Sequence, residues 1–199
     1  MSKSNLEKKI LDTATELFAE HGFVKASIRD IAKQVNGSNS CLYVYFKNKD
    51  EILFRIITDV GAELIHALNA VISENEDPVE CLKQMIYAQI LLSMNAPKKM
   101  KIYLEEQYQL SPALKERALQ QHREIYDLYY GALDALEKAG LLCAQIDKVV
   151  MTFGIFSHMN WVYRWLNPAG PLSVEEVAKH SITMLLRSIL QNPPSEVRV

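Results

Sequence analysis

The residues best suited to recognise another molecule lie in the segment 27–52, SIRDIAKQVNGSNSCLYVYFKNKDEI. Within it, Ser38, Asn39 and Ser40 follow a Gly-containing turn and precede an aromatic run. Small hydroxyl and amide side chains let a helix approach the edges of DNA bases closely, and an asparagine amide can pair with adenine. The chemistry expected of this segment is therefore hydrogen bonding to nucleic acid.

The remainder of the sequence lacks the patterns of a catalytic or metal site. The five histidines are scattered without His-x-x-x-His spacing, and Cys41, Cys81 and Cys143 form no ligand or redox pair. Glu105 and Glu106 are adjacent, so on a helix their carboxylates would point in different directions. We therefore expect no catalytic residue, no metal and no cofactor.

Composition indicates a globular, cytoplasmic protein. Apolar residues make up 49% of the 199 residues, no apolar run is long enough to span a bilayer, and the first residues lack the apolar core of a signal peptide. Residues 1–50 carry 8 Lys and Arg against 6 Asp and Glu, a net charge of +2; the chain as a whole carries −2, which leaves −4 for the rest. A basic first segment supports nucleic-acid binding weakly, and chance explains so small a value equally well.

Helical signals repeat along the chain and strand signals are nearly absent, so the sequence predicts an all-α fold. Helix starts are marked by capping residues and by Pro at the first helical position, and Gly22 and Gly140 mark two helix ends. The predicted helices are 4–21, 27–35, 38–45, 48 to about 73, one from 77, one from 97, 111–139, 147 to about 166, and 173 to before 193.

The helices predicted at 27–35 and 38–45 are short and are joined by a very tight turn. Asn36 and Gly37 both tolerate a positive φ, which suits the abrupt change of direction in a helix-turn-helix motif. An ordinary pair of short helices fits the same spacing, so this motif alone leaves both interpretations open.

Three motifs in residues 6–53 resemble the TetR family of transcriptional regulators: FAEHGF at 18–23, IRDIA at 28–32 and LYVYFKNKDEIL at 42–53. The resemblance implies an N-terminal three-helix DNA-binding domain with Leu42 and Phe46 in its core. It places residues 39, 40, 41 and 45 at the major groove, Tyr43 and Lys49 on phosphates, and residues 27 and 29 on the backbone or a nearby base. The DNA-binding residues implied are thus Ser27, Arg29, Ser38, Asn39, Ser40, Cys41, Tyr43, Tyr45 and Lys49.

The turn departs from the family pattern, in which Gly and an apolar residue precede the Ser. Here the order is Asn36-Gly37-Ser38, which removes an apolar contact and predicts a looser turn with a different sequence preference. Cys41 stands where Thr is common. A small polar contact to DNA is the favoured interpretation of this cysteine, and a redox sensor is the alternative.

The resemblance divides the chain into a DNA-binding domain at 1–50 and a larger helical domain at 51–199 for ligand binding and dimerisation. Residues 158–176, HMNWVYRWLNPAGPLSVEE, resemble a TetR subgroup in which some members respond to CoA thioesters. Arg164 would then meet a phosphate, and Trp161 or Trp165 would stack on the ligand; alternatively, both tryptophans pack a dimer interface. The ligand-binding residues implied are Tyr103 (near a pocket entrance), Tyr126, Phe156, Trp161, Arg164 and Trp165.

The function expected is that of a homodimeric, ligand-responsive repressor that binds a pseudo-palindromic operator in double-stranded DNA and is released by a small apolar effector, with an acyl-CoA as a candidate. The last two helices would form the dimer, with Ile182 and Leu186 at the contact. Three alternatives stay open at this point: a helical-bundle enzyme acting on a hydrophobic small molecule, an activator, and a non-specific DNA-binding protein.

Overall fold

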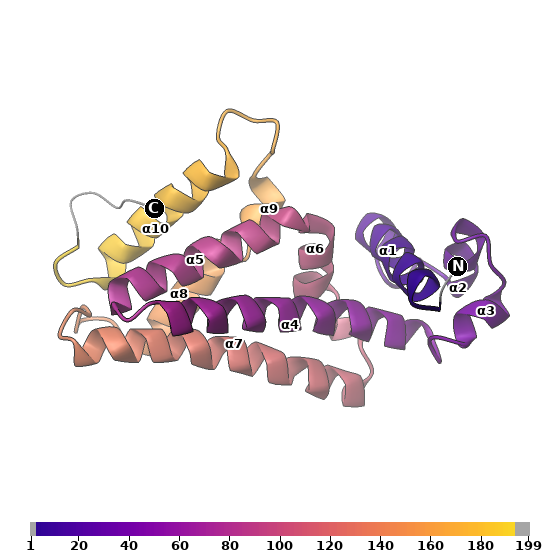
Figure 1. Ribbon diagram of the computed structural model, residues 1–199, viewed down its shortest axis with the longest axis horizontal. Helices are drawn as coiled ribbons and strands as arrows, with labels where there is room; N and C mark the ends of the chain where they lie inside the picture. The colour runs from indigo at the N-terminus through magenta and orange to yellow at the C-terminus, as the bar shows by residue number, and fades with distance from the viewer. Residues whose placement is uncertain (1–2, 194–199) are drawn as a thin grey trace. The chain divides into compact units, whose positions relative to one another are not determined.

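The computed structural model describes residues 3–193, and these form helices and one isolated β-bridge (Figure 1). The prediction of an all-α fold is confirmed. Contacts divide the described residues into two compact units, one containing 3–62 and 98–122, the other 63–97 and 123–193. This division differs from the predicted boundary after residue 50, which stays a prediction about function.

The first unit contains the predicted helix-turn-helix, formed by α1 (Lys3–His21), α2 (Ile28–Gln34) and α3 (Asn39–Tyr43). To these it adds the first part of α4 (Lys49–Glu74), α6 (Pro97–Glu105), the 3-10 helix η1 (Gln107–Gln109) and the first part of α7 (Pro112–Lys138). Leu42 and Phe46 are 1% and 5% exposed, which confirms their predicted place in the core. The core of this unit also includes Ile10, Phe18, Ile31, Ile52 and Leu53.

The second unit contains α5 (Pro78–Asn95), α8 (Lys148–Met159), α9 (Val162–Trp165) and α10 (Val174–Ile189), together with the later parts of α4 and α7. Helix α5 packs against α8, α9 and α10 (Figure 1). Tyr129 of α7 is fully buried; its hydroxyl donates to the Met85 carbonyl at 3.1 Å, and its ring meets that of Phe156 edge-on at 5.2 Å. The isolated bridge, between Leu142 and Leu190, was not predicted.

Local capping explains where most helices begin and end. Side chains of Ser27, Ser38, Asp77, Asp147 and Ser173 accept backbone N–H groups at the starts of α2, α3, α5, α8 and α10, as predicted. Gly22 and Gly140 adopt φ of 80° and 71° at the ends of α1 and α7, also as predicted. Helix α1 begins at Lys3, one residue before its predicted cap Ser4, whose side chain lies outside the described part of the chain.

One predicted helix, 147–166, is broken in the structure. Helix α8 ends at Met159 and α9 begins at Val162. Asn160 ends α8, and its side-chain oxygen accepts a hydrogen bond from the buried Gln89 amide at 3.3 Å. Asparagine favours such competing contacts over a helix interior, which accounts for the break.

Of the described residues, helix α4 alone is long and apolar enough to cross a membrane by length and composition. Core helices of water-soluble proteins pass the same test. Ile57, Leu64 and Leu68 of α4 are at most 2% exposed, which is the pattern of a helix that contributes to a protein core. The length of α4 therefore carries no membrane assignment.

Candidate DNA-binding surface and effector residues

Helix α2 begins with a reciprocal capping box. The Ser27 hydroxyl accepts the Asp30 N–H at 3.2 Å, and the Asp30 carboxylate accepts the Ser27 N–H at 3.0 Å. The hydrogen bonds from Ser27 hold the pKa of Asp30 below its usual value, so the carboxylate stays ionised. Ser27 thus fixes the start of α2, and its side chain and that of Arg29 are exposed.

The turn between α2 and α3 depends on Asn36 for its direction. Asn36 adopts a φ of 57°, whereas Gly37 does not have a positive φ. The Gly37 N–H donates to the Ala32 carbonyl at 2.9 Å, and the Ser38 hydroxyl accepts the Cys41 N–H at 3.2 Å. One of the two residues predicted to tolerate positive φ therefore makes the turn, and α3 starts directly after it.

Helix α3 exposes small polar side chains over a buried leucine. Ser38, Asn39 and Ser40 are exposed, while Cys41 and Tyr45 are half-buried. Tyr43 is 54% exposed and is followed by Val44, which is 68% exposed. Such a face can offer hydroxyl and amide groups to base edges, and a valine methyl to the methyl group of thymine. The roles of these residues in DNA binding stay predictions.

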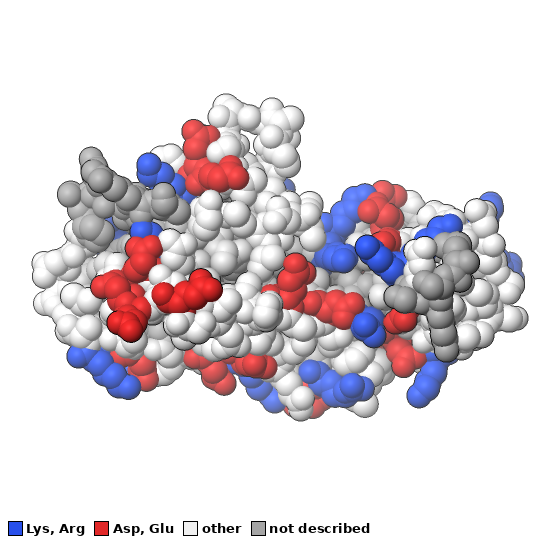
Figure 2. Space-filling view, in the orientation of Figure 1, with Lys and Arg blue, Asp and Glu red and all other residues white. Residues whose placement is uncertain are grey.

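Sequence reasoning missed Val44. It stands between Leu42 and Phe46, whose four-residue spacing predicts one buried side of the helix, and its place off that side was the available signal. On the face of the molecule drawn in Figure 2, Lys and Arg are interspersed with Asp and Glu.

Lys49, at the start of α4, was expected to contact phosphate, and the structure gives its ammonium other partners. Its Nζ donates to the carbonyls of Phe23 at 2.7 Å, Ala26 at 2.8 Å and Val24 at 3.3 Å, and lies 4.2 Å from the centre of the Phe23 ring. Partial burial lowers the pKa of Lys49. We therefore assign Lys49 to holding the α1–α2 connection, in place of the direct phosphate contact.

Helix α6 and η1 also hold helix α1 and the connection that follows it, which the sequence did not predict. Lys98 pairs with Glu16 and with Glu20, and the Lys101 ammonium donates to the Ala19 carbonyl at 2.6 Å. Just after α6, the Glu106 carboxylate accepts the Phe23 N–H at 3.3 Å. These contacts tie α6 to the end of α1 within the first unit.

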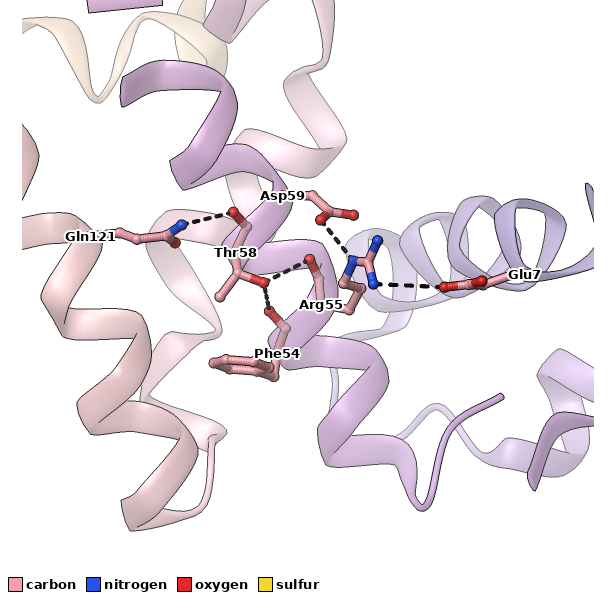
Figure 3. A network of polar contacts seen from close by, with 6 residues as sticks. All are labelled: Glu7, Phe54, Arg55, Thr58, Asp59 and Gln121. Atoms are coloured by element: carbon pink, nitrogen blue, oxygen red, sulfur yellow. Dashed lines mark hydrogen bonds and ion pairs between the residues drawn. The ribbon is translucent and has the colours of Figure 1, made fainter. Parts of the chain in front are cut away.

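Helix α4 has its own polar contacts in this unit (Figure 3). The Arg55 guanidinium pairs with Asp59 at 2.8 Å and reaches Glu7 of α1 at 3.7 Å. On α7, the Gln121 amide donates to the Thr58 carbonyl at 3.1 Å. Helices α1, α4 and α7 are thereby joined by side-chain contacts that flank a single turn of α4.

Tyr103, predicted at a pocket entrance, is instead buried in the first unit with 3% of its surface exposed. Its hydroxyl lies 3.1 Å from His122 Nδ1, and the two rings stack with centroids 4.5 Å apart. The prediction of an entrance is therefore wrong, because α6 packs Tyr103 inward against α7.

The other five predicted ligand residues belong to the second unit. Tyr126 and Phe156 are half-buried, and Phe156 contacts the buried Tyr129. Trp161 and Trp165 are 50% and 56% exposed, and the Arg164 guanidinium lies 5.0 Å from the Trp161 ring. This exposure favours the alternative of an interface role for the tryptophans; ligand contacts for all five residues stay predictions.

Exposed apolar side chains occur on α8. Val149, Val150 and Phe153 are 42%, 62% and 56% exposed, and their spacing puts them on one side of the helix, here called the α8 stripe. By contrast, Ile182 and Leu186 of α10 are 0% and 1% exposed. Their predicted place at a dimer contact is wrong, because α10 buries that face inside its own unit.

Comparison with known proteins connects this geometry to a family. Residues 10–56 match the family described as bacterial regulatory proteins, tetR family, and residues 75–189 match the tetracyclin repressor-like C-terminal domain. The HTH-type transcriptional repressor KstR2 of Rhodococcus jostii is 28% identical over 92% of this chain and 91% of its own length.

Solved structures share the fold. The TetR family transcriptional regulator PfmR of Thermus thermophilus is 27% identical, with a TM-score of 0.82 over 89% of this chain and 97% of its own. The regulator AibR, solved in complex with isovaleryl coenzyme A and operator DNA, is 24% identical, with a TM-score of 0.82 over 90% of this chain and 97% of its own. The chain therefore belongs to the TetR family of bacterial transcriptional regulators and is a ligand-responsive DNA-binding regulator, not an enzyme.

Proposed function

We propose that this protein is a cytoplasmic repressor that binds a pseudo-palindromic operator as a homodimer and leaves it when an effector binds. The exposed polar face of α3, held over the buried Leu42, is the observation that carries the proposal. Helix α3 has five residues and offers few base contacts, so the DNA-binding domain of a single chain would bind weakly. The DNA-binding domains of two chains, placed in successive major grooves about 34–36 Å apart, would together bind tightly and would match the two-fold symmetry of the operator.

The α8 stripe supports the dimer. Large apolar side chains that stay exposed in one chain favour a contact with another chain, and two-fold dimers use the same surface on both partners. Helix α10 contributes Met184, which is 52% exposed. The interface proposed is thus the α8 stripe with the outer side of α10.

Asn39 is the residue proposed to read a base. Replacing it with alanine should lower affinity for the preferred operator by about 5- to 150-fold and relax the preference at one position of each half-site, because one bidentate amide pair contributes about 1–3 kcal/mol. Selection of bound sequences from a random DNA pool, followed by titration, measures both effects. Asn69→Ala, at an exposed position of α4, is the matched control and should change neither. An unaltered preference in the Asn39 variant would remove Asn39 from the base-reading set.

The effector class to test first is an acyl-CoA thioester. AibR is solved with isovaleryl coenzyme A, and residues 158–176 resemble a thioester-responsive subgroup. Fluorescence anisotropy of the selected operator should show release at micromolar acyl-CoA, with chains from isovaleryl to palmitoyl, and no release by free CoA, which lacks the apolar part. A complex that survives the whole panel would mean that another class of molecule is the effector.

A further inference from the structure

Several buried polar atoms of the first unit have no hydrogen-bond partner. Within the described residues, the side-chain atoms Gln107 Oε1, Gln121 Oε1 and His122 Nε2 are all buried and unpartnered, and they fall in one short segment from η1 into α7. Buried polar atoms in native proteins nearly always find a partner, and leaving one unmet is unfavourable. Gln121 Oε1 packs closely against Gly61, which leaves His122 Nε2 and Gln107 Oε1 as the atoms whose missing hydrogen bonds a bound molecule can supply.

The hydrogen bond between Tyr103 and His122 leaves the other ring nitrogen of His122 without a partner. Burial lowers the pKa of His122, so the imidazole is neutral and carries one proton. If the Tyr103 hydroxyl donates to Nδ1, then Nε2–H is a buried donor without an acceptor. If Nδ1–H donates to the hydroxyl oxygen, then Nε2 is a buried acceptor without a donor, so either tautomer leaves Nε2 unmet.

Gln107 lies outside α6, in the 3-10 helix η1 that follows it. It is 9% exposed, and its amide oxygen is unpartnered. Tyr103, Gln107 and His122 are all uncharged at neutral pH, and an ionic group brought among them would be buried without a counter-charge. A neutral oxygen-bearing group meets no such cost.

We propose that the Tyr103–His122 pair forms a polar subsite that receives a neutral carbonyl or hydroxyl group of an otherwise apolar effector. The subsite rests on the proposed function only in that the protein has such an effector. A carbonyl oxygen accepts from His122 Nε2–H, and a hydroxyl serves whichever tautomer is present. The charged part of any effector stays outside this subsite.

The position of the subsite connects it to the DNA-binding surface. Tyr103 lies on α6 between Lys101, which holds the Ala19 carbonyl, and Glu106, which holds the Phe23 N–H. His122 is half-buried and its Nε2 is closed off from solvent, so in this proposal a ligand reaches that nitrogen by a movement of α6 relative to α7. That displacement loosens the contacts of α6 with the end of α1, and so weakens the placement of α2 and α3.

Nuclear magnetic resonance of protein labelled with ¹⁵N in its histidines tests the subsite without DNA or CoA. The probes are cyclohexanone and methylenecyclohexane, which share a shape and differ in that only the ketone accepts a hydrogen bond. Cyclohexanone should shift the His122 Nε2 resonance in a saturable way, and methylenecyclohexane should not. The His122 signals are assigned by their absence from His122→Phe, and His66→Phe, at an exposed position, is the matched control.

Two variants separate a ligand role from a packing role. His122→Phe keeps a stacked ring and should weaken cyclohexanone binding at least 10-fold, measured from backbone amide shifts of uniformly ¹⁵N-labelled protein because this variant lacks the His122 resonance. The double variant Tyr103→Phe/His122→Phe removes both polar partners, so the ligand-free protein should melt at the same temperature or higher. A purely structural pair predicts a lower melting temperature for the double variant and unchanged ketone binding by His122→Phe.

Equal shifts with both probes, or no shift with either, would overturn the subsite. These results are independent of the acyl-CoA panel. A saturable ketone shift combined with a negative panel leaves the subsite in place and rejects the thioester, whereas operator release by thioesters without any His122 shift rejects the subsite alone.

Discussion

Replacing Lys49 with methionine is expected to lower operator affinity by at least about 10-fold while leaving the salt dependence of binding unchanged. Methionine keeps an apolar side chain against Phe23 and loses the three hydrogen bonds to the carbonyls of residues 23, 24 and 26. Hydrogen bonds from a charged group contribute about 1.5–3 kcal/mol, and each 1.4 kcal/mol is tenfold in affinity. The loss would appear both as a lower free energy of unfolding and as a poorly placed α2.

The salt dependence distinguishes this role from a phosphate contact. A lysine that binds phosphate displaces about one counterion, so its removal reduces the slope of log affinity against log salt by about 0.9. Lys47→Met, two residues earlier and exposed, is the matched control and should leave the free energy of unfolding unchanged. If Lys49→Met reduced the slope by about one charge and left stability intact, the original assignment to phosphate would be right.

Arginine in place of Phe153 is expected to convert the dimer to a monomer and to lower operator affinity by on the order of 100-fold or more. Phe153 is 56% exposed in one chain and central to the α8 stripe. An unpaired charge buried in the interface costs about 3–5 kcal/mol, and the remaining interface contacts are not expected to offset that loss. Sedimentation velocity and operator anisotropy on the same sample measure both effects, and circular dichroism should show that the helices remain.

Two further variants test whether the stripe is the interface. Asn69→Arg, at an exposed position of α4, should stay dimeric with full affinity. Ile182→Arg should instead unfold the second unit, because Ile182 is 0% exposed inside that unit. A wild-type protein that sediments as a monomer, or a Phe153 variant that remains a dimer, would contradict the proposed assembly.

The sequence was most informative where the physics is local. Helix starts at Ser27, Asp77 and Ser173 could be read directly, because a cap and the N–H groups it satisfies lie within three residues of each other. The three motifs that resemble the TetR family, within residues 18–53, fall inside the segment 10–56 that matches the family. The hydrogen-bond partners of Lys49, by contrast, are 23 to 26 residues away in the sequence, and no local pattern predicts them.

The sequence also could not show whether an apolar helix face lies in the core or at an interface. Helix α10 has the regular apolar spacing of an amphipathic helix, which fits an internal core and an interface equally well; only the packing shows that Ile182 lies inside. In the same way, the sequence analysis predicted both Tyr103 and Trp161 as bulky ligand-binding side chains. One proved buried and hydrogen-bonded and the other half exposed, because burial depends on contacts between distant helices.

In the proposed release mechanism, the contacts that tie α6 to α1 set the sensitivity of the regulator to its effector. The side chains of Lys98, Glu16 and Glu20 are each about half exposed, at 47%, 52% and 54%, and exposed ion pairs contribute little to stability because solvent screens them. Coupling between two sites is itself small, so weak contacts of this kind can alter it. Surface substitutions at residues 16, 20 and 98 can therefore shift the effector dose for half-maximal gene expression, in either direction, while the amino acids that touch DNA and effector stay the same. Regulators that respond at different effector concentrations could evolve from this chain by changes in charge alone.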